Sequence, residues 1–290
     1  MGNTEYWHWT EFTWKSDRKW GGAENITCGI DVGSTSSQAV LLANNNILAY
    51  SSIRTGSSSP RSAIRALTAA IEGTGLSQND IDFVVGTGYG RVNVPFANRT
   101  ITEISCHGRG TYHMASSVRT ILDMGGQDCK VIHIDERGKV IQFLMNDKCA
   151  AGAGRGMEVI ADLLAVPITE VGQLSLEADK EVPPILSTCV VFAKTEVIRL
   201  LHGGWSKAQV LAAYCEATAH RVYTLIRRIG LIKDFAVTGG IAKNVGVVKR
   251  VEDKLGVKGV AIMPDPQIAG ALGAALFAQD LLANQKETGG

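Results

Sequence analysis

Two cysteines that each precede helix-forming sequence are the residues of this 290-residue chain with the most distinctive chemistry. Cys149 lies in the segment Asn146–Glu158, and Cys189 lies in Ser187–Glu196. The N–H groups at the start of a helix carry partial positive charge and favour anionic groups, including a thiolate-bound cluster. A [4Fe–4S] cluster takes four thiolates. The pair therefore predicts half of a cluster, which two chains would complete together.

Packing in a core is the alternative role for any one of these cysteines, because cysteine is among the most frequently buried residue types. That role is the expectation for the other four, which are Cys28, Cys106, Cys129 and Cys215. Six irregularly spaced cysteines do not make a disulfide scaffold in a chain of this size. A reducing cytoplasm is therefore the expected location.

Two aspartates, Asp31 and Asp123, each end an expected strand and precede a tight turn of small residues. The turns Asp31–Thr35 and Asp123–Gln127 share the pattern Asp-x-Gly followed by Ser or Gly. Such turns point backbone N–H groups at phosphate oxygens, and Mg²⁺ prefers one or two carboxylates together with phosphate oxygens. One Asp-x-Gly is weak evidence, but the paired copies predict a nucleotide site with Mg²⁺.

A third glycine-containing element, Val237–Asn244, follows an expected strand and opens a helix. Its glycines could let a purine or a ribose approach the backbone. The sequence contains neither a Walker loop nor a Rossmann fingerprint, so both of those nucleotide folds are excluded. The segment Gly86–Arg91 has differently spaced glycines and is interpreted as a hinge or a turn.

The elements that must position these residues follow one pattern twice, three strands in succession and then alternating helices and strands. This predicts an α/β architecture with a duplicated core. The expected strands are residues 26–33, 38–43, 47–53, 81–85, 120–123, 130–135, 140–144, 235–238 and 259–263, and the expected helices are residues 61–72, 154–164, 190–201, 207–228, 244–255 and 268–282.

The composition is ordinary for a globular protein, with 45% apolar and 20% charged residues. A net charge of +1 gives no sign of a nucleic-acid or membrane-surface partner. No apolar run reaches the roughly 18 residues of a membrane span. The first 25 residues hold four tryptophans, Trp7, Trp9, Trp14 and Trp20, without a strand or helix pattern. Docking on another subunit and packing on the chain's own domain are both open for this segment.

The three glycine-containing elements resemble the phosphate-1, phosphate-2 and adenosine motifs of the acetate kinase–sugar kinase–Hsp70–actin superfamily. Within it, the chain is similar to the BadF/BadG/BcrA/BcrD-type ATPases, which activate 2-hydroxyacyl-CoA dehydratases or serve benzoyl-CoA reductase. The two cysteine segments make this resemblance specific, because they are not general to the superfamily. The matching segments are residues 29–35, 102–110, 122–128, 146–152, 187–193, 237–243 and 264–274.

The resemblance implies a ribonuclease H-like, duplicated α/β fold of two lobes with a nucleotide cleft. Lobe I would comprise residues 26–115 with the C-terminal helix 266–284, lobe II would comprise residues 116–265, and residues 1–25 would be an extension. It also implies that Cys149 and Cys189 ligate the shared [4Fe–4S] cluster. Asp31 and Asp123 would be catalytic, and for Glu103 an ATP-site role and a helix-start role are both open. The nucleotide-binding residues would be Gly33, Ser34, Thr35, Gly125, Gly126, Gln127, Gly239, Gly240 and Lys243.

The implied function is an ATP-hydrolysing, electron-activating subunit that sends low-potential electrons to a catalytic partner. The Trp-rich extension resembles that of a benzoyl-CoA reductase subunit and favours that system. A homodimeric activator of a 2-hydroxyacyl-CoA dehydratase is the alternative, and a sugar kinase or a non-catalytic ATP-binding scaffold are alternatives of other classes. The implied partners are an identical or paralogous ATPase subunit, catalytic reductase or dehydratase subunits, and a low-potential donor such as ferredoxin.

Overall fold

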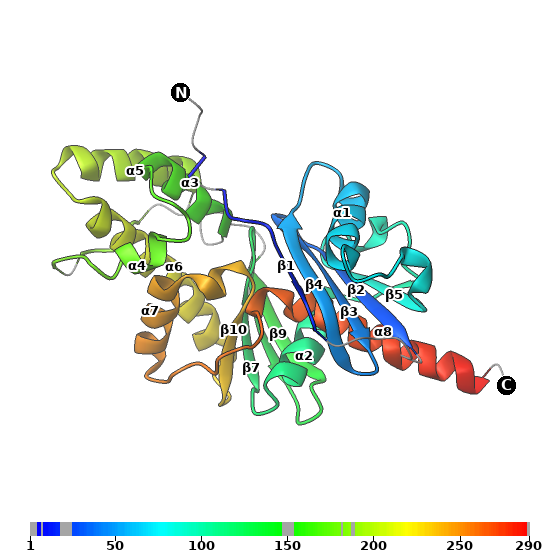
Figure 1. Ribbon diagram of the computed structural model, residues 1–290. Coiled ribbons are helices and arrows are strands. Elements are labelled where there is room, and N and C mark those ends of the chain that lie inside the picture. The colour runs from blue at the N-terminus through cyan, green and yellow to red at the C-terminus, as the bar shows by residue number, and fades with distance from the viewer. Residues whose placement is uncertain are drawn as a thin grey trace. The chain divides into compact units, whose positions relative to one another are not determined.

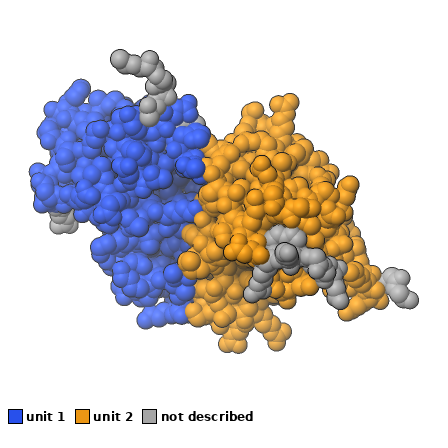
Figure 2. Space-filling view, in the orientation of Figure 1, with its two compact units in different colours: residues 1–10, 122–131, 143–261 blue, residues 11–121, 132–142, 262–290 orange. Residues whose placement is uncertain are grey.

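The computed structural model describes residues 5–6, 8–17, 25–146, 154–180, 182–186 and 189–288. The chain forms two compact units (Figure 2). Unit 1 comprises residues 1–10, 122–131 and 143–261, and unit 2 comprises residues 11–121, 132–142 and 262–290. The lobe boundaries expected from the sequence stay a prediction.

Unit 2 contains a six-stranded sheet with the order β1-β4-β3-β2-β5-β6 (Figure 1). Strands β2, β3 and β4 pair antiparallel, whereas β5 pairs parallel with β2 and with β6. The sheet is apolar on both faces, which is the pattern of a sheet covered on both sides. The strands are β1 Phe12–Lys15, β2 Ile26–Val32, β3 Ser36–Ala43, β4 Asn46–Arg54, β5 Phe83–Thr87 and β6 Arg99–Thr100.

Helices α1, Ser59–Ile71, and α8, Ala269–Thr288, cover the opposite faces of this sheet (Figure 1). Alternate residues of β3 show this, because Leu41 belongs to the apolar cluster that contains α1, whereas Val40 belongs to the cluster that contains α8. Helix α2, Glu103–Met114, packs on α8. The short 3-10 helices of this unit are η1 Gln78–Asp80, η2 Arg91–Asn93 and η5 Pro266–Ile268.

The second sheet has the strand order β10-β7-β8-β9. This order matches the run β5-β2-β3-β4 of the first sheet, so that β7 corresponds to β2 and β10 corresponds to β5. The duplication predicted from the sequence is thereby confirmed. The strands are β7 Thr120–Met124, β8 Cys129–Ile134, β9 Val140–Asn146 and β10 Phe235–Thr238.

The helices of unit 1 enclose one large apolar core against β7 and β10, whose buried members include Leu122, Met157, Tyr214 and Phe235. Side-chain caps define two helix starts, since Ser206 forms a capping box with Gln209 and Asn244 accepts a hydrogen bond from the amide of Val247. The helices are α3 Gly154–Leu164, α4 Val171–Leu174, α5 Val190–His202, α6 Lys207–Ile229, η4 Gly240–Lys243 and α7 Val245–Leu255.

The first 25 residues differ from the expectation, because they contain strand β1. Phe12–Lys15 pairs antiparallel with β4, and the Trp14 ring stacks on Tyr50 with 5.3 Å between ring centroids. Glu11 also forms an ion pair with Arg65 of α1. The expectation of a segment without a strand is therefore wrong. Trp7 and Trp20 lie outside the described residues.

Other elements also differ, including the short strand β6 and the short helix α4, which were not expected. Residues 259–263 form no strand, and Val260 makes a single backbone hydrogen bond to Phe235. Helix α2 is missing from the expected helices, because Gly108 and Gly110 lower its helix propensity, although a helix start is one of the two roles left open for Glu103. In the described part of the chain, every helix is too short or too polar to cross a membrane.

Candidate functional site

Asp31 lies at the end of β2, and its carboxylate occupies a recess made by glycines. Gly33 turns the chain tightly, since its amide donates to the Ser36 carbonyl oxygen at 3.0 Å. A Cβ atom on Gly88 would overlap Asp31 Oδ1, and a Cβ atom on Gly270 would overlap Asp31 Oδ2. Any side chain at either position would displace the carboxylate. Glycine is therefore required on both sides of it.

His107 is a neighbour of Asp31 that the sequence pattern does not reveal. His107 Nε2 lies 3.9 Å from Asp31 Oδ2, and both side chains are buried. The histidine comes from α2, the helix that the sequence pattern does not indicate. The preceding residue, Cys106, is also buried, and burial raises the pKa of its thiol to about 12. Cys28, Cys129 and Cys215 are buried as well, which confirms the expected core role of these four cysteines.

Glu103 is the first residue of α2 and forms an ion pair with Arg91 at 3.1 Å. The same Arg91 guanidinium donates to the Gly88 carbonyl oxygen at 3.0 Å. Glu103 thus anchors the loop of residues 86–91 against α2. The sequence indicates a hinge or a turn for this loop, and the structure places it against Asp31. The ATP-site role of Glu103 stays a prediction.

Ser34 and Thr35 form the rest of the first phosphate turn, and both are partly exposed. The Thr35 carbonyl oxygen accepts a hydrogen bond from the Thr55 amide at 2.9 Å, and the Gly33 carbonyl oxygen accepts one from Thr55 Oγ1 at 2.9 Å. The segment after β4 therefore fixes the backbone of this turn.

Asp123 lies in β7, at the place that Asp31 has in β2, and is buried. Thr238 Oγ1 donates to Asp123 Oδ1 at 3.1 Å, and Lys130 Nζ lies 3.4 Å from Asp123 Oδ2. Lys130 also pairs with Asp128 at 2.5 Å. Lys130 is a second residue that the sequence pattern does not reveal. Its position one residue into β8 gives no sign of a partner seven residues earlier.

The second phosphate turn is tied to the start of α3. The amide of Gly125 donates to the Asp128 carbonyl oxygen, which closes the turn. The amides of Gly154 and Arg155 donate to the Gly125 and Gly126 carbonyl oxygens at 2.9 and 2.7 Å. Gln127, at the tip of the turn, is exposed.

Gly239 follows β10 and has φ +80°, a conformation that favours glycine. A Cβ atom there would overlap the Met124 carbonyl oxygen and lie 3.0 Å from Asp123 Oδ1. The predicted adenosine and phosphate-2 elements are therefore in contact within unit 1. Gly240 begins the short helix η4, which ends at Lys243, and both residues are exposed.

Of the two expected cluster ligands, the structure describes one. Cys149 lies outside the described residues. Cys189 is the exposed N-cap residue of α5. An exposed thiol at a helix N-terminus fits a cluster ligand, because the helix dipole stabilises negative charge there. Where the chain is described, no three His, Cys, Asp or Glu side chains form a metal site.

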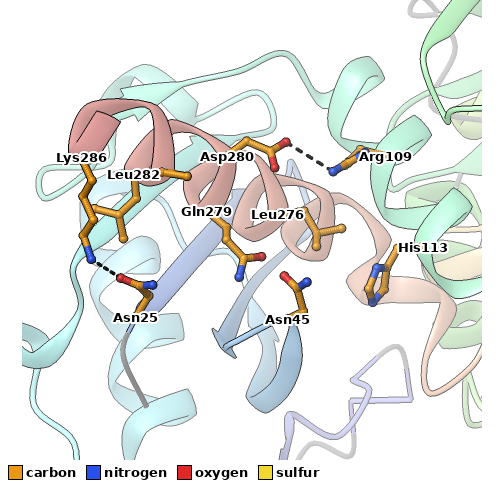
Figure 3. Close-up of a pocket in the computed structure, with 10 residues that line it drawn as sticks. Asn25, Asn45, Arg109, His113, Leu276, Gln279, Asp280, Leu282 and Lys286 are labelled. Atoms are coloured by element: carbon orange, nitrogen blue, oxygen red, sulfur yellow. Dashed lines mark hydrogen bonds and ion pairs between the residues drawn. The ribbon is translucent and has the colours of Figure 1, made fainter. Parts of the chain in front are cut away.

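A cavity of about 370 Å³ lies on unit 2, where α2, α8 and two loops meet (Figure 3). Its polar side chains already pair with one another, since Arg109 contacts Asp280 at 3.3 Å and Lys286 donates to Asn25 Oδ1 at 2.5 Å. None of the predicted nucleotide-binding residues lines it. This cavity therefore does not correspond to the predicted nucleotide site.

Comparison with known proteins gives consistent matches. The sequence profile of the BadF/BadG/BcrA/BcrD ATPase family matches residues 28–278. The activator of lactoyl-CoA dehydratase from Anaerotignum propionicum is 47% identical over 88% of this chain and 97% of its own length. A component of the benzoyl-CoA reductase from Thauera aromatica is 33% identical over 87% of this chain and 92% of its own length.

Among solved structures, the activator of the 2-hydroxyisocaproyl-CoA dehydratase from Clostridium difficile, with bound ADPNP, superimposes with a TM-score of 0.86. It is 40% identical, and the match covers 91% of this chain and 97% of that chain. The predicted fold class, the duplicated α/β fold of actin, Hsp70 and sugar kinases, is thereby confirmed.

Proposed function

Because the chain belongs to the BadF/BadG/BcrA/BcrD ATPase family, we propose that it is an ATP-hydrolysing activator of a 2-hydroxyacyl-CoA dehydratase. The observation that carries the proposal is the pair of aspartates, Asp31 and Asp123, at corresponding strand ends. Each lies beside a glycine at which an added Cβ atom would overlap the carboxylate of the aspartate or the backbone of its strand. Two buried carboxylates beside amide-rich turns are the donor set for Mg²⁺ and phosphates.

ATP is proposed to bind with Asp31 and Asp123 near its Mg²⁺ ion. The turn residues Ser34, Thr35 and 125–127 would contact phosphate oxygens. Gly239, Gly240 and Lys243 would border the adenosine, and the relative with bound ADPNP supports a nucleotide at this fold. Mg²⁺ would stabilise the charge that develops on the transferred phosphoryl group.

Cys149 and Cys189 are proposed to hold half of a [4Fe–4S] cluster, with the same two cysteines of a second chain holding the other half. The cluster supplies one-electron transfer at low potential. The exposed Cys189 thiol at the start of α5 supports this assignment. ATP binding would favour one arrangement of the two units through contacts that differ between arrangements. The electron donor would be a low-potential protein such as ferredoxin, and a reducing cytoplasm would suit the free thiols.

Benzoyl-CoA reduction, the function that the Trp-rich extension suggests, is the less favoured candidate. That expectation treats the extension as an anchor on another subunit. Strand β1 uses part of the extension within the chain's own sheet, so this argument loses its basis. The 47% and 33% identities also favour the dehydratase activators over the reductase component. A sugar kinase is not favoured either, because the relatives with close sequence similarity are activators.

Iron analysis of the anaerobically purified chain, together with ATP turnover, tests the proposal. We expect about two iron atoms per chain, a brown chromophore and electron delivery to a 2-hydroxyacyl-CoA dehydratase but not to a benzoyl-CoA reductase. Cys149→Ser and Cys189→Ser should each lose the iron and keep nucleotide binding. Cys106→Ala, at a buried thiol, is the matched control and should keep the iron. A colourless wild-type chain with full ATP turnover would contradict the cluster.

A further inference from the structure

We propose that Lys130 is a positioning residue that holds the Asp123 carboxylate ready for a Mg²⁺-bound nucleotide. This role rests on the proposed nucleotide site and concerns its metal side. Lys130 is 3% exposed, and its ammonium group lies between the carboxylates of Asp123 and Asp128.

Two contacts to Asp123 come from neighbouring strands of its own sheet. In the order β10-β7-β8, the strand that carries Asp123 has one neighbour on each side. Thr238, the last residue of β10, donates to Oδ1 at 3.1 Å, and Lys130, in β8, lies 3.4 Å from Oδ2. Each carboxylate oxygen is thus fixed by an adjacent strand. The orientation of Asp123 follows from strand pairing and does not require a bound ligand.

Charge gives the second reason for this lysine. Asp123 and Asp128 are both buried, and two carboxylates that share a site repel each other. One ammonium group between them leaves the group of three with a net charge of −1. A buried charge without a partner is strongly unfavourable. Lys130 therefore favours the inward orientation of the Asp123 side chain, where a divalent cation would add a second positive partner.

Lys130 has a simpler alternative role, as the counter-ion of Asp128, which an experiment must distinguish from the positioning of Asp123. The shorter contact of Lys130 is to Asp128, whose carbonyl oxygen also closes the phosphate-2 turn with the Gly125 amide. Lys130 could serve only as the counter-ion of Asp128. In that case its loss would lower stability, and removal of the Asp128 charge would repair the damage. If Lys130 positions Asp123, the same removal would repair stability and leave metal-dependent binding impaired.

The test is calorimetric titration of the full-length, anaerobically purified chain with ADP, in excess Mg²⁺ and in EDTA. For Lys130→Met we expect MgADP affinity to fall by about tenfold or more, and metal-free ADP affinity to change by less than about threefold. For Lys130→Met with Asp128→Asn we expect the melting temperature to recover toward wild type, while MgADP affinity stays low. Asp128→Asn alone leaves the Lys130–Asp123 contact, so its MgADP affinity should stay within about threefold of wild type.

The opposite results overturn the role. Wild-type MgADP affinity in Lys130→Met, or its recovery in the double variant, would leave Lys130 as a counter-ion only. If Lys130→Met does not fold, the double variant and Asp128→Asn decide, and an equal loss of MgADP affinity in both would also overturn it. A wild-type chain that binds no MgADP would instead refute the nucleotide site itself, so the two failures are distinct.

Discussion

The surroundings of Asp31 in unit 2 and Asp123 in unit 1 are two versions of one arrangement. Each aspartate lies in a strand that pairs with a strand whose last residue is a threonine followed by glycine, Thr87–Gly88 in one case and Thr238–Gly239 in the other. Gly88 and Gly239 have φ +84° and +80°. A Cβ atom on either would press on the carbonyl oxygen of the residue after the aspartate. The duplication thus extends to single backbone positions.

The side-chain neighbours of the two aspartates differ. Asp123 is held by Thr238 and Lys130, which come from the strands on either side of it. No such hydrogen bond joins Thr87 Oγ1 to Asp31, and one polar neighbour of Asp31 is His107 of α2. The first arrangement is fixed by strand pairing, whereas the second depends on how α2 and α8 pack on the sheet.

The largest expected effect is the loss of either carboxylate. Asp31→Asn and Asp123→Asn should each lower ATP turnover by on the order of 10²–10³-fold, the effect of removing one group that stabilises developing charge. Iron content should not change, because the predicted cluster ligands lie elsewhere. Steady-state ATPase assays with iron analysis check this. Unchanged turnover in one variant would show that the two sites are not functionally equivalent.

The shared glycines come next. Gly88→Ala and Gly239→Ala should each lower the free energy of unfolding by roughly 2–4 kcal/mol, because a positive φ strains alanine and the added Cβ overlaps a backbone carbonyl. Gly75→Ala in unit 2 and Gly256→Ala in unit 1 are matched controls. Both glycines have positive φ and open space around them, so only about 1 kcal/mol should be lost there. Urea unfolding measures all four, and equal losses in test and control variants would contradict the overlap.

Substitution of His107 should affect MgADP affinity less than substitution of Lys130. His107→Leu should weaken MgADP binding by about threefold to tenfold, because Asp31 loses a polar neighbour but stays inside its glycine recess. His107→Gln, which keeps a side-chain N–H, should restore most of this affinity. Titration calorimetry gives both values. A loss as large as that for Lys130→Met, without rescue by glutamine, would show that Asp31 is positioned as strictly as Asp123.

The smallest effect is a dependence of stability on alkaline pH that both units share. Burial raises the pKa of the thiols of Cys106 in unit 2 to about 12, and of Cys129 and Cys215 in unit 1 to about 12 and about 11. Each pKa is raised in the folded chain. The stabilisation is therefore complete below the unfolded value of 9.0 and is lost as the pH rises toward the folded values.

Urea midpoints between pH 8 and about 10 measure this effect, with roughly 1 kcal/mol lost per thiol over the first pH unit above 9. Cys106→Ala should reduce the slope by the share of one thiol and leave the share of the other buried thiols. A slope that Cys106→Ala does not change would contradict the assignment to this thiol.

The sequence predicts the parts of the site that local patterns determine. Asp31, Asp123 and Gly239 each lie at a strand end before a turn, and a strand followed by glycine can be recognised from the local sequence pattern. The roles of Lys130 and His107 cannot be predicted in this way, because they depend on which element packs beside each residue in the folded chain. A lysine inside a strand or a histidine inside a helix has no local signature. The repeated Thr-Gly pair is visible in the sequence, but its two copies sit in loops of different length and glycine spacing.

The missed elements of the fold have the same cause. Helix α2 contains Gly108 and Gly110, which weaken its helical pattern, and the structure shows that these glycines allow close packing. A Cβ atom on Gly108 would lie 2.9 Å from Val140, and one on Gly110 would overlap the Ala269 carbonyl oxygen. Strand β1 is short and mostly exposed, and its pairing with β4 is a contact distant in sequence. Non-local contacts of this kind override local propensity.

Helix α8 has a consequence for the order in which the chain can fold during synthesis. Residues 269–288 follow every other described helix and strand along the chain, yet they cover a face of the sheet that contains β2 and β3. At Gly29 in β2 and at Gly110 in α2, the lack of a side chain lets the backbone of α8 approach closely. Unit 1 has emerged by residue 261, whereas the first sheet keeps one apolar face uncovered until residues 269–288 have also emerged. The sheet whose strands emerge before the helices of unit 1 is therefore covered only after those helices have emerged.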